Sequence, residues 1–202
     1  MTGNRSGAAP ATGVAALRLA EGRDIPALEA LIARSARALQ AATYAPAQIE
    51  AALGTVFAVD TQLIADGTYY VAVHADAIVG CGGWSRRRTL FGGHGAASVR
   101  DDSALDPTHD PARIRAFFVH PNHARQGIGR LLLSECERAA IAARFRRLEL
   151  VATLAGEPLY LACGFRAVER YPVTLHDGSS LPVVRMVKTP TIAVPASAVA
   201  RR

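Results

Sequence analysis

The stretch VHPNHARQGIGRLLL, residues 119–133, decides the fold of this chain. It continues a short apolar strand, residues 116–119, that breaks at Pro121. A loop with Gly127 and Gly129 comes next, and a leucine-rich helix begins directly after it. A strand, a glycine loop and a helix start form a general anion site, because free backbone N–H groups and the positive end of the helix point at the ligand.

The loop also carries charge that suits a phosphate group. Arg125 and Arg130 supply guanidinium groups, and the glycines let the backbone approach a ligand without a Cβ in the way. A plain helix entry with solvated arginines is the alternative interpretation of the loop taken alone.

Two nucleotide-binding loops fit this stretch less well. A nucleoside-triphosphate loop needs GxxxxGK followed by Ser or Thr, which is absent. A dinucleotide loop, GxGxxG, finds its first two glycines, and Glu149 lies twenty residues beyond Gly129, where a ribose-binding acid would sit. However, Leu132 occupies the third glycine position, and seven residues separate Val119 from Gly127. A nicotinamide-dependent oxidoreductase is therefore a less favoured hypothesis.

Hydrophobic periodicity predicts one α/β (α+β) domain with a mixed, mostly antiparallel sheet of six to seven strands flanked by helices. Strands are predicted over residues 14–19, 69–74, 78–84, 113–119, 148–152, 165–175 and 182–188. Helices are predicted over residues 24–39, 46–59, 128–144 and 156–163. Residues 86–110 are polar and aperiodic, which predicts a long loop. Cys136 falls on the buried face of its helix and is predicted to be a core residue.

Composition limits the partners and the compartment. A chain of 202 residues suits one well-buried domain, which we place at 14–188, with a disordered lead-in over 1–13 and a flexible tail over 189–202. The net charge of +6 is carried almost wholly by arginine, a bias that does not by itself indicate nucleic-acid binding, so none is expected. No apolar run approaches the ~18–20 residues of a membrane span. Three widely spaced cysteines without a CxxC pair fit the reducing cytoplasm and predict neither a disulfide framework nor a metal site.

The strand followed by HPNHARQGIGRLLL resembles the acetyl-CoA-binding motif of the GNAT N-acetyltransferase superfamily. That motif reads Gln or Arg, two residues, Gly, one residue, then Gly or Ala. Gly127 and Gly129 match the small positions, whereas Ala124 stands at the first position. Downstream, LEL at 148–150 and PLYLACGF at 158–165 resemble the family's next strand and its Tyr-x-x-x-Gly-Phe signature. Thr153 stands where many relatives carry asparagine.

The resemblance implies an N-acetyltransferase with acetyl-CoA as co-substrate and no metal. The acetyl group would pass to a primary amine by direct attack through a tetrahedral intermediate, so no cysteine need act as nucleophile. Tyr160 is implied as the general acid, since a phenol stays protonated at neutral pH. Glu149 is a candidate general base, because it alternates with the leucines on either side of it in its strand. The strand edge and loop would hold the co-substrate through Phe117, Phe118, Val119, Arg125, Gln126, Gly127, Ile128, Gly129 and Arg130.

A second hypothesis keeps the same fold without the chemistry. Ala124, Thr153 and the unsettled base leave open a catalytically silent CoA-binding regulatory module. The acceptor is a small-molecule or peptide amine whose identity the sequence does not give. A homodimer is suggested by family analogy alone.

Overall fold

The structure is a computed structural model that describes residues 15–89 and 101–190. The predicted lead-in over 1–13, the middle of the predicted 86–110 loop and most of the predicted tail lie outside the described residues. Strands are β1 (Ala16–Leu19), β2 (Tyr69–His74), β3 (Ala77–Ser85), β4 (Ala112–Val119), β5 (Leu148–Thr153), β6 (Arg166–Thr174) and β7 (Ser180–Lys188). Helices are α1 (Ile25–Leu39), α2 (Pro46–Ala52), α3 (Thr61–Ala65), α4 (Ile128–Ala142) and α5 (Glu157–Ala162), with 3-10 turns at Gly22–Asp24 and Pro121–His123.

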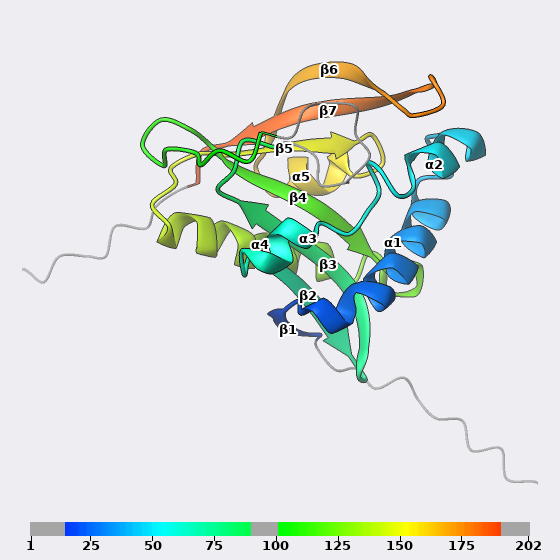
Figure 1. Cartoon of the computed structure of the whole chain (residues 1–202), viewed down its shortest axis with the longest axis horizontal. Coiled ribbons are helices and arrows are strands. Elements are labelled where there is room, and N and C mark those ends of the chain that lie inside the picture. Colours follow the sequence, from blue (N-terminus) through cyan, green and yellow to red (C-terminus); the bar gives the residue numbers. More distant parts are fainter. Residues whose placement is uncertain (1–14, 90–100, 191–202) are drawn as a thin grey trace, which may run out of the picture.

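The strands form a single seven-stranded sheet in the order β1-β2-β3-β4-β5-β7-β6 (Figure 1). Every neighbouring pair is antiparallel except β4 and β5, which run parallel because α4 carries the chain back between them. The predicted fold class, a mixed and mostly antiparallel sheet flanked by helices, is confirmed.

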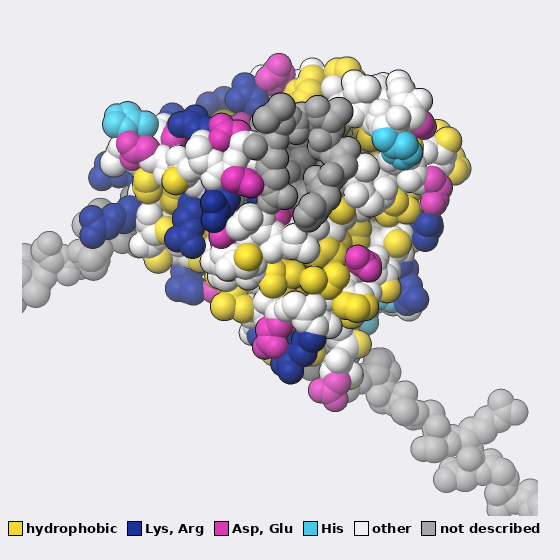
Figure 2. Space-filling view, viewed as in Figure 1, with side chains coloured by type: hydrophobic (Ala, Val, Ile, Leu, Met, Phe, Trp, Pro, Cys, Tyr) yellow, Lys and Arg dark blue, Asp and Glu magenta, His cyan; other side chains and the backbone are white. Residues whose placement is uncertain are grey.

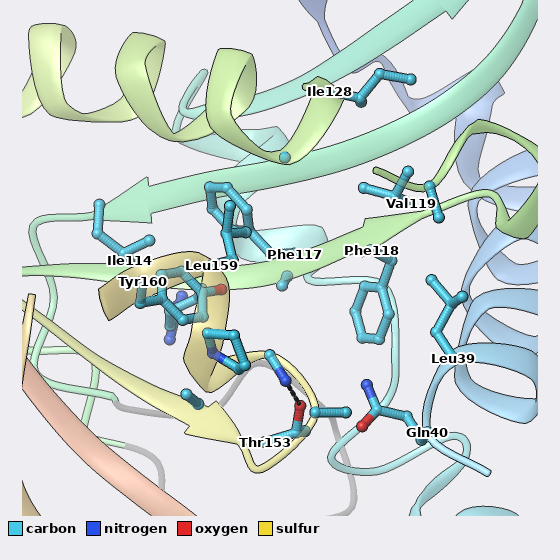
Figure 3. Close-up of a pocket in the computed structure, with 18 of the residues that line it drawn as sticks. Leu39, Gln40, Ile114, Phe117, Phe118, Val119, Ile128, Thr153, Leu159 and Tyr160 are labelled. Atoms are coloured by element: carbon cyan, nitrogen blue, oxygen red, sulfur yellow. Dashed lines mark hydrogen bonds between the residues drawn. The ribbon is translucent and has the colours of Figure 1, made fainter. Parts of the chain in front are cut away.

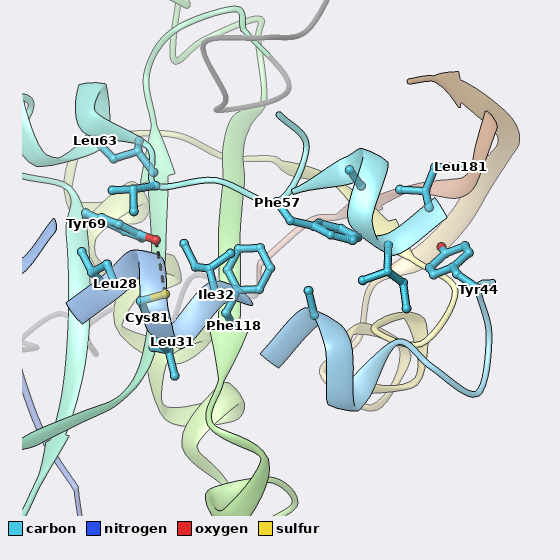
Figure 4. Close-up of a cluster of buried hydrophobic side chains, with 14 of the residues drawn as sticks. Leu28, Leu31, Ile32, Tyr44, Phe57, Leu63, Tyr69, Cys81, Phe118 and Leu181 are labelled. Carbon is cyan, nitrogen blue, oxygen red and sulfur yellow. Dashed lines mark hydrogen bonds between the residues drawn. The ribbon is translucent and has the colours of Figure 1, made fainter. Parts of the chain in front are cut away.

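Hydrophobic cores cover both faces of this sheet. On one face α1, α2 and α3 pack against the strands, with Leu28, Ile32, Leu63 and Tyr69 almost wholly buried (Figure 4). On the other face α4 and α5 build the second core, which contains Cys136 at 0% exposure, so its predicted place in the core is confirmed.

The predicted helix over 46–59 is wrong in its second half. The helix α2 ends at Ala52, because Leu53 is extended and Gly54 has a φ of +75°. The chain then forms the short helix α3, whose first turn is capped by Asp60, which accepts a hydrogen bond from Leu63 N–H at 3.3 Å. Sequence periodicity missed α3 because five residues are too few to show a helical repeat.

The parallel pair β4 and β5 holds together over only part of its length. The paired residues run from Ala112 opposite Leu148 to Ile114 opposite Leu150. Beyond that point β4 continues to Val119 alongside β3, while β5 continues to Thr153 alongside β7. The sheet is therefore split between β4 and β5 at the carboxyl ends of both strands. No helix among the described residues is long and apolar enough to span a membrane.

Candidate active site

The split in the sheet opens into a cavity of about 490 Å³ (Figure 3). Its wall is built from the end of β4, the start of α4, the end of β5, the helix α5, the end of α1 and the α2–α3 connection. Side chains from segments more than 100 residues apart in the chain, such as Gln40 and Tyr160, face the same space.

A bulge in β4 shapes one wall of the cavity. The register with β3 shifts between Cys81 and Gly83, and Ala116 at this point has a φ of +58°. A left-handed alanine costs roughly 1–2 kcal/mol, so the surroundings must hold it. The Tyr69 hydroxyl lies 3.3 Å from the Ala116 carbonyl and 3.2 Å from Cys81 Sγ, which anchors the bulge from the buried side.

Within the described ranges, the end of β4 has no strand paired to it on the side that faces β5. His120 N–H donates to the Val79 carbonyl at 2.8 Å, so these two residues form a bonded pair across β3 and β4. Opposite residues in an antiparallel ladder alternate between bonded and non-bonded pairs. Phe118, opposite Cys81, therefore directs its N–H and C=O to β3, whereas Val119 directs its own groups toward the side that β5 has left. Of the predicted co-substrate contacts on this strand, Val119 therefore has a peptide edge that faces the opening.

The glycine loop turns sharply before α4. Arg125 has a φ of +63° and Gly127, the N-cap of α4, a φ of +86°. Gly129 sits so close to α5 that a Cβ on it would lie 3.0 Å from a methyl carbon of Leu159. This close approach places the start of α4 directly beside α5 in the cavity wall.

Most of the predicted co-substrate contacts meet in this cavity. Its lining includes Phe117, Phe118, Val119, Arg125, Gly127, Ile128, Gly129 and Arg130. Gln126 is outside the lining, and its side chain donates to the Asn122 carbonyl at 3.0 Å, which ties the loop to the preceding turn.

Tyr160 reaches the cavity from α5. Its ring contacts Phe117 at 6.2 Å between ring centres and Phe165 at 5.9 Å, both edge to face. Among the described residues its hydroxyl has no hydrogen-bond partner, although the residue is only 8% exposed. Burial, followed by the neighbouring Cys136 and Cys163, raises the pKa of this phenol above its ordinary value, so it stays protonated at any physiological pH.

Glu149 is not part of the cavity wall. It lies opposite Arg113 in the parallel pair, with Oε2 2.8 Å from Arg113 Nη1, and Arg185 stands 3.7 Å from the other oxygen. The carboxylate is 8% exposed and compensated by two guanidinium groups. This placement accounts for a carboxylate in mid-strand without a role as a base.

One histidine lines the cavity, and two of the cysteines are buried. His123 lines the cavity beside the glycine loop, and its ring is 5.6 Å from that of His120. Burial, the nearby Arg34 and His123 lower the pKa of His120, whose ring nitrogen lies 3.0 Å from the Arg34 guanidinium. Cys81 and Cys136 are fully buried, and burial raises the pKa of both thiols, that of Cys81 to about 12. Neither thiol is therefore a thiolate nucleophile at neutral pH.

The far end of the cavity contains residues that sequence patterns did not single out. Leu39 and Gln40 come from the end of α1, and Val56, Phe57 and Ala58 from the α2–α3 connection. None belongs to a motif, and only their convergence in space gives them a role. Thr153 also lines the cavity, and its hydroxyl accepts a hydrogen bond from Gly156 N–H at 3.1 Å, which fixes the turn into α5.

Fold and site together define a class: a mixed α/β domain whose split parallel strand pair faces a helix N-terminus. A family model described as an acetyltransferase (GNAT) domain matches residues 65–167, just over half of the chain. The chain therefore belongs to the GNAT acetyltransferase family. No curated protein sequence matches it.

Solved structures share the fold at low sequence identity. A GCN5-related N-acetyltransferase from Rhodopseudomonas palustris is 21% identical with a TM-score of 0.66, over 88% of this chain and 97% of that one. The PaiA N-acetyltransferase from Thermoplasma acidophilum, in complex with coenzyme A, is 15% identical with a TM-score of 0.62, over 87% and 99%. The yncA protein from Salmonella typhimurium, with its cofactor acetyl-CoA, is 18% identical with a TM-score of 0.57, over 92% and 99%.

Proposed function

We propose that the chain is an N-acetyltransferase that moves the acetyl group of acetyl-CoA to a primary amine by direct attack through a tetrahedral intermediate. One observation carries this proposal: the start of α4, the free edge of β4 and the Tyr160 hydroxyl open onto the same cavity. Structural relatives bound to coenzyme A and acetyl-CoA support the choice of co-substrate.

The residues present suit a thioester carried on a phosphorylated arm. The left-handed turn at Arg125 and Gly127 leads into the N-terminus of α4, where backbone N–H groups and the helix dipole favour a pyrophosphate. Arg125 and Arg130 add positive charge beside it. The free N–H and C=O of Val119 can pair with the amides of a pantetheine arm, as a neighbouring strand would.

Tyr160 is assigned as the general acid. Collapse of the tetrahedral intermediate expels the coenzyme A thiolate, and a neutral phenol on the cavity wall can protonate that sulfur. The raised pKa keeps the phenol in its acid form. Because Glu149 is held by Arg113 and Arg185 outside the cavity, it is given no part in the proton transfer.

A silent CoA-binding module remains the second candidate, and one observation favours it. None of the described residues that line the cavity is Asp or Glu, so the wall offers no carboxylate base. The two candidates make the same prediction for binding and opposite predictions for turnover.

The test combines binding with turnover. Acetyl-CoA is titrated calorimetrically into the wild type, into Arg130→Glu at the start of α4, and into Arg146→Glu, the same charge reversal at an exposed site beyond the end of α4. We expect Arg130→Glu, but not Arg146→Glu, to lose at least ~10-fold in affinity for acetyl-CoA. The reason is that one charge-assisted phosphate contact is worth about 1.4 kcal/mol or more.

Release of free thiol in the presence of a panel of primary amines then separates the candidates. Thiol release matched by acetylated amine supports an enzyme. Binding without release for any amine supports the silent module, and no binding by the wild type contradicts both.

A further inference from the structure

The cavity has two chemically different ends. One end holds the glycine loop with its arginines. The other, which we call the acceptor arm, is lined by Leu39, Gln40, Val56, Phe57, Phe118 and Val151. Gln40 is the single polar side chain of this set. The rings of Phe57 and Phe118 meet edge to face at 6.1 Å with an 82° angle between their planes, so the arm has an aromatic wall (Figure 4).

Among the described residues, no carboxylate lines the acceptor arm. The described part of the cavity wall contains no Asp or Glu, and the segments outside the described residues, 1–14, 90–100 and 191–202, contain none in their sequence. Two buried carboxylates elsewhere in the structure are already bound by arginine, Asp60 by Arg115 at 2.8 Å and Glu149 by Arg113 at 2.8 Å.

This lack of negative charge selects against ammonium ions. An alkylamine with the pKa of lysine, about 10.4, is only ~0.1% uncharged at pH 7.5, and its ammonium form would lose water in the arm without gaining a counter-ion. The net charge of +6 and the arginines of the glycine loop disfavour a polycation further. An amine that is already uncharged at neutral pH meets neither penalty.

Gln40 supplies the polar contact that such an amine needs. Its Oε1 is buried and accepts no hydrogen bond from the described residues, although the side chain lies on the cavity wall (Figure 3). A half-turn of the terminal amide, which exchanges the positions of Oε1 and Nε2, would bury the NH₂ group instead. Either orientation therefore leaves one buried polar atom without a hydrogen-bond partner among the described residues. Buried polar atoms are normally paired, and a ligand cannot reach an atom that has no exposed surface. The half-turn of the amide is therefore the step that directs Oε1 into the arm, where a ligand N–H would donate to it.

We propose that the acceptor is a small aromatic primary amine, uncharged at neutral pH, whose ring lies against Phe57 and Phe118 and whose N–H donates to Gln40. This assignment rests on the proposed acetyltransferase activity. The balance of the reaction agrees with it. The amine nitrogen first forms a bond to the acetyl carbon, which gives the tetrahedral intermediate. The C–S bond breaks when this intermediate collapses, the nitrogen loses one proton, and the departing thiolate gains one. No base has to remove a proton before the attack.

The test uses two isomeric acceptors, 4-methylaniline and benzylamine, which contain the same atoms but differ in charge at neutral pH. Thiol release and product mass are measured at pH 7.5 with acetyl-CoA, with spermidine and a short peptide bearing a free α-amine as further acceptors. We expect kcat/KM for 4-methylaniline to exceed that for benzylamine by at least ~10-fold, since desolvating an unpaired ammonium ion costs more than one factor of ten.

Variants of Gln40 sharpen the test. Gln40→Leu should raise the KM for 4-methylaniline about 5- to 10-fold while the affinity for acetyl-CoA stays unchanged. Gln40→Glu should lower the preference for 4-methylaniline over benzylamine, because it introduces the missing negative charge. Gln62→Leu is the matched control: Gln62 lies on α3, outside the cavity lining, and bonds to Asp66 at 3.0 Å.

Preference of the wild type for benzylamine, spermidine or the peptide would overturn this assignment while leaving the acetyltransferase in place. An unchanged KM in Gln40→Leu would overturn the role of Gln40. Failure of the wild type to bind acetyl-CoA would instead overturn the proposed function on which the assignment rests.

Discussion

The two ends of the cavity differ in how they are built. The end that includes the glycine loop comes from one continuous stretch, β4 to α5, and much of its chemistry lies in backbone groups and turn geometry. The acceptor arm comes from α1, the α2–α3 connection, β4 and β5, and its chemistry lies in ordinary apolar side chains and one amide. The first end can be conserved in geometry while side chains vary, whereas the second can change its ligand through single substitutions.

The charge on the molecule follows the same division. Arg125 and Arg130 line the cavity at the glycine loop, whereas the six residues of the acceptor arm are uncharged. A third lining arginine, Arg115 on β4, is paired with Asp60. On the surface drawn in Figure 2, basic side chains are interspersed with acidic ones. The two ends of the cavity therefore differ in charge, whereas the surface drawn in Figure 2 has no comparable separation of basic and acidic side chains.

The largest effect should come from the general acid at the junction of the two ends. Tyr160→Phe should lower kcat about 100-fold or more, the usual contribution of a positioned acid, with acetyl-CoA affinity almost unchanged. Tyr171→Phe, which removes the hydroxyl of a half-buried tyrosine on β6, is the control and should keep its kcat. Steady-state kinetics measure both. A kcat in Tyr160→Phe within ~3-fold of the wild type would remove Tyr160 from the chemistry.

The pH dependence follows from the same residue. Burial raises the folded-state pKa of Tyr160, and a raised pKa extends the protonated form to higher pH. Ionisation of Tyr160 should therefore not lower the kcat of the wild type between pH 8 and 10. Any loss of kcat over this range should also be seen in Tyr160→Phe. A fall with a midpoint below about 9, abolished in the variant, would show that the phenol ionises too early to serve as the acid.

Glu149 tests whether a side chain outside the cavity matters for chemistry or for stability. Glu149→Gln should cost roughly 3 kcal/mol of unfolding free energy, because it leaves Arg113 buried without its main counter-charge. Its kcat should stay within ~3-fold of the wild type, against the 10²–10⁴-fold expected for loss of a general base. Glu169→Gln, at the exposed pair with Arg185, should cost less than ~1 kcal/mol. Denaturant unfolding and kinetics on the same samples decide between the two roles.

The smallest effect is expected at the edge of the acceptor arm. Leu39→Ala removes an apolar contact at a residue that is 36% exposed, which should raise the acceptor KM roughly 5-fold, or about 1 kcal/mol, without changing acetyl-CoA binding. Leu19→Ala on β1, at 46% exposure and outside the cavity lining, should change neither. Equal effects of the two substitutions would show that the arm does not contact the acceptor.

The difference between the two ends also explains what the sequence could predict. Gly127, Gly129 and Tyr160 lie within one local stretch of strand, loop and helices. Their sequence pattern predicted the elements, and the resemblance to the acetyltransferase motif implied that they share one site. The bulge at Ala116 left no sequence signal, because an alanine in a run of apolar strand residues does not indicate a positive φ. The pairing of Glu149 with Arg113 depends on the register of two parallel strands, and that register is set by the whole sheet.

The residues of the acceptor arm could not be predicted for a related reason. Leu39 continues the apolar stripe of α1 at helical spacing, which is typical of a core residue, yet it is partly exposed and lines the cavity. Gln40 follows the helix and has no periodicity of its own. Their role arises only where the end of α1 meets β4 across more than 70 residues of sequence.

The central claim is that the start of α4 binds the phosphates of acetyl-CoA. It is tested most directly by calorimetric titration of acetyl-CoA into the wild type, Gly127→Glu and Gly178→Glu. Both glycines have a positive φ, +86° and +81°, and open space around a new Cβ, so both substitutions carry the same strain of roughly 1–2 kcal/mol and the same new charge.

Gly178 lies in the turn between β6 and β7, outside the cavity lining, and differs from Gly127 in that respect. We predict micromolar binding by the wild type and Gly178→Glu, and at least ~100-fold weaker binding by Gly127→Glu, a difference of about 2.7 kcal/mol. Equal binding by the two variants, or no binding by the wild type, would contradict the claim.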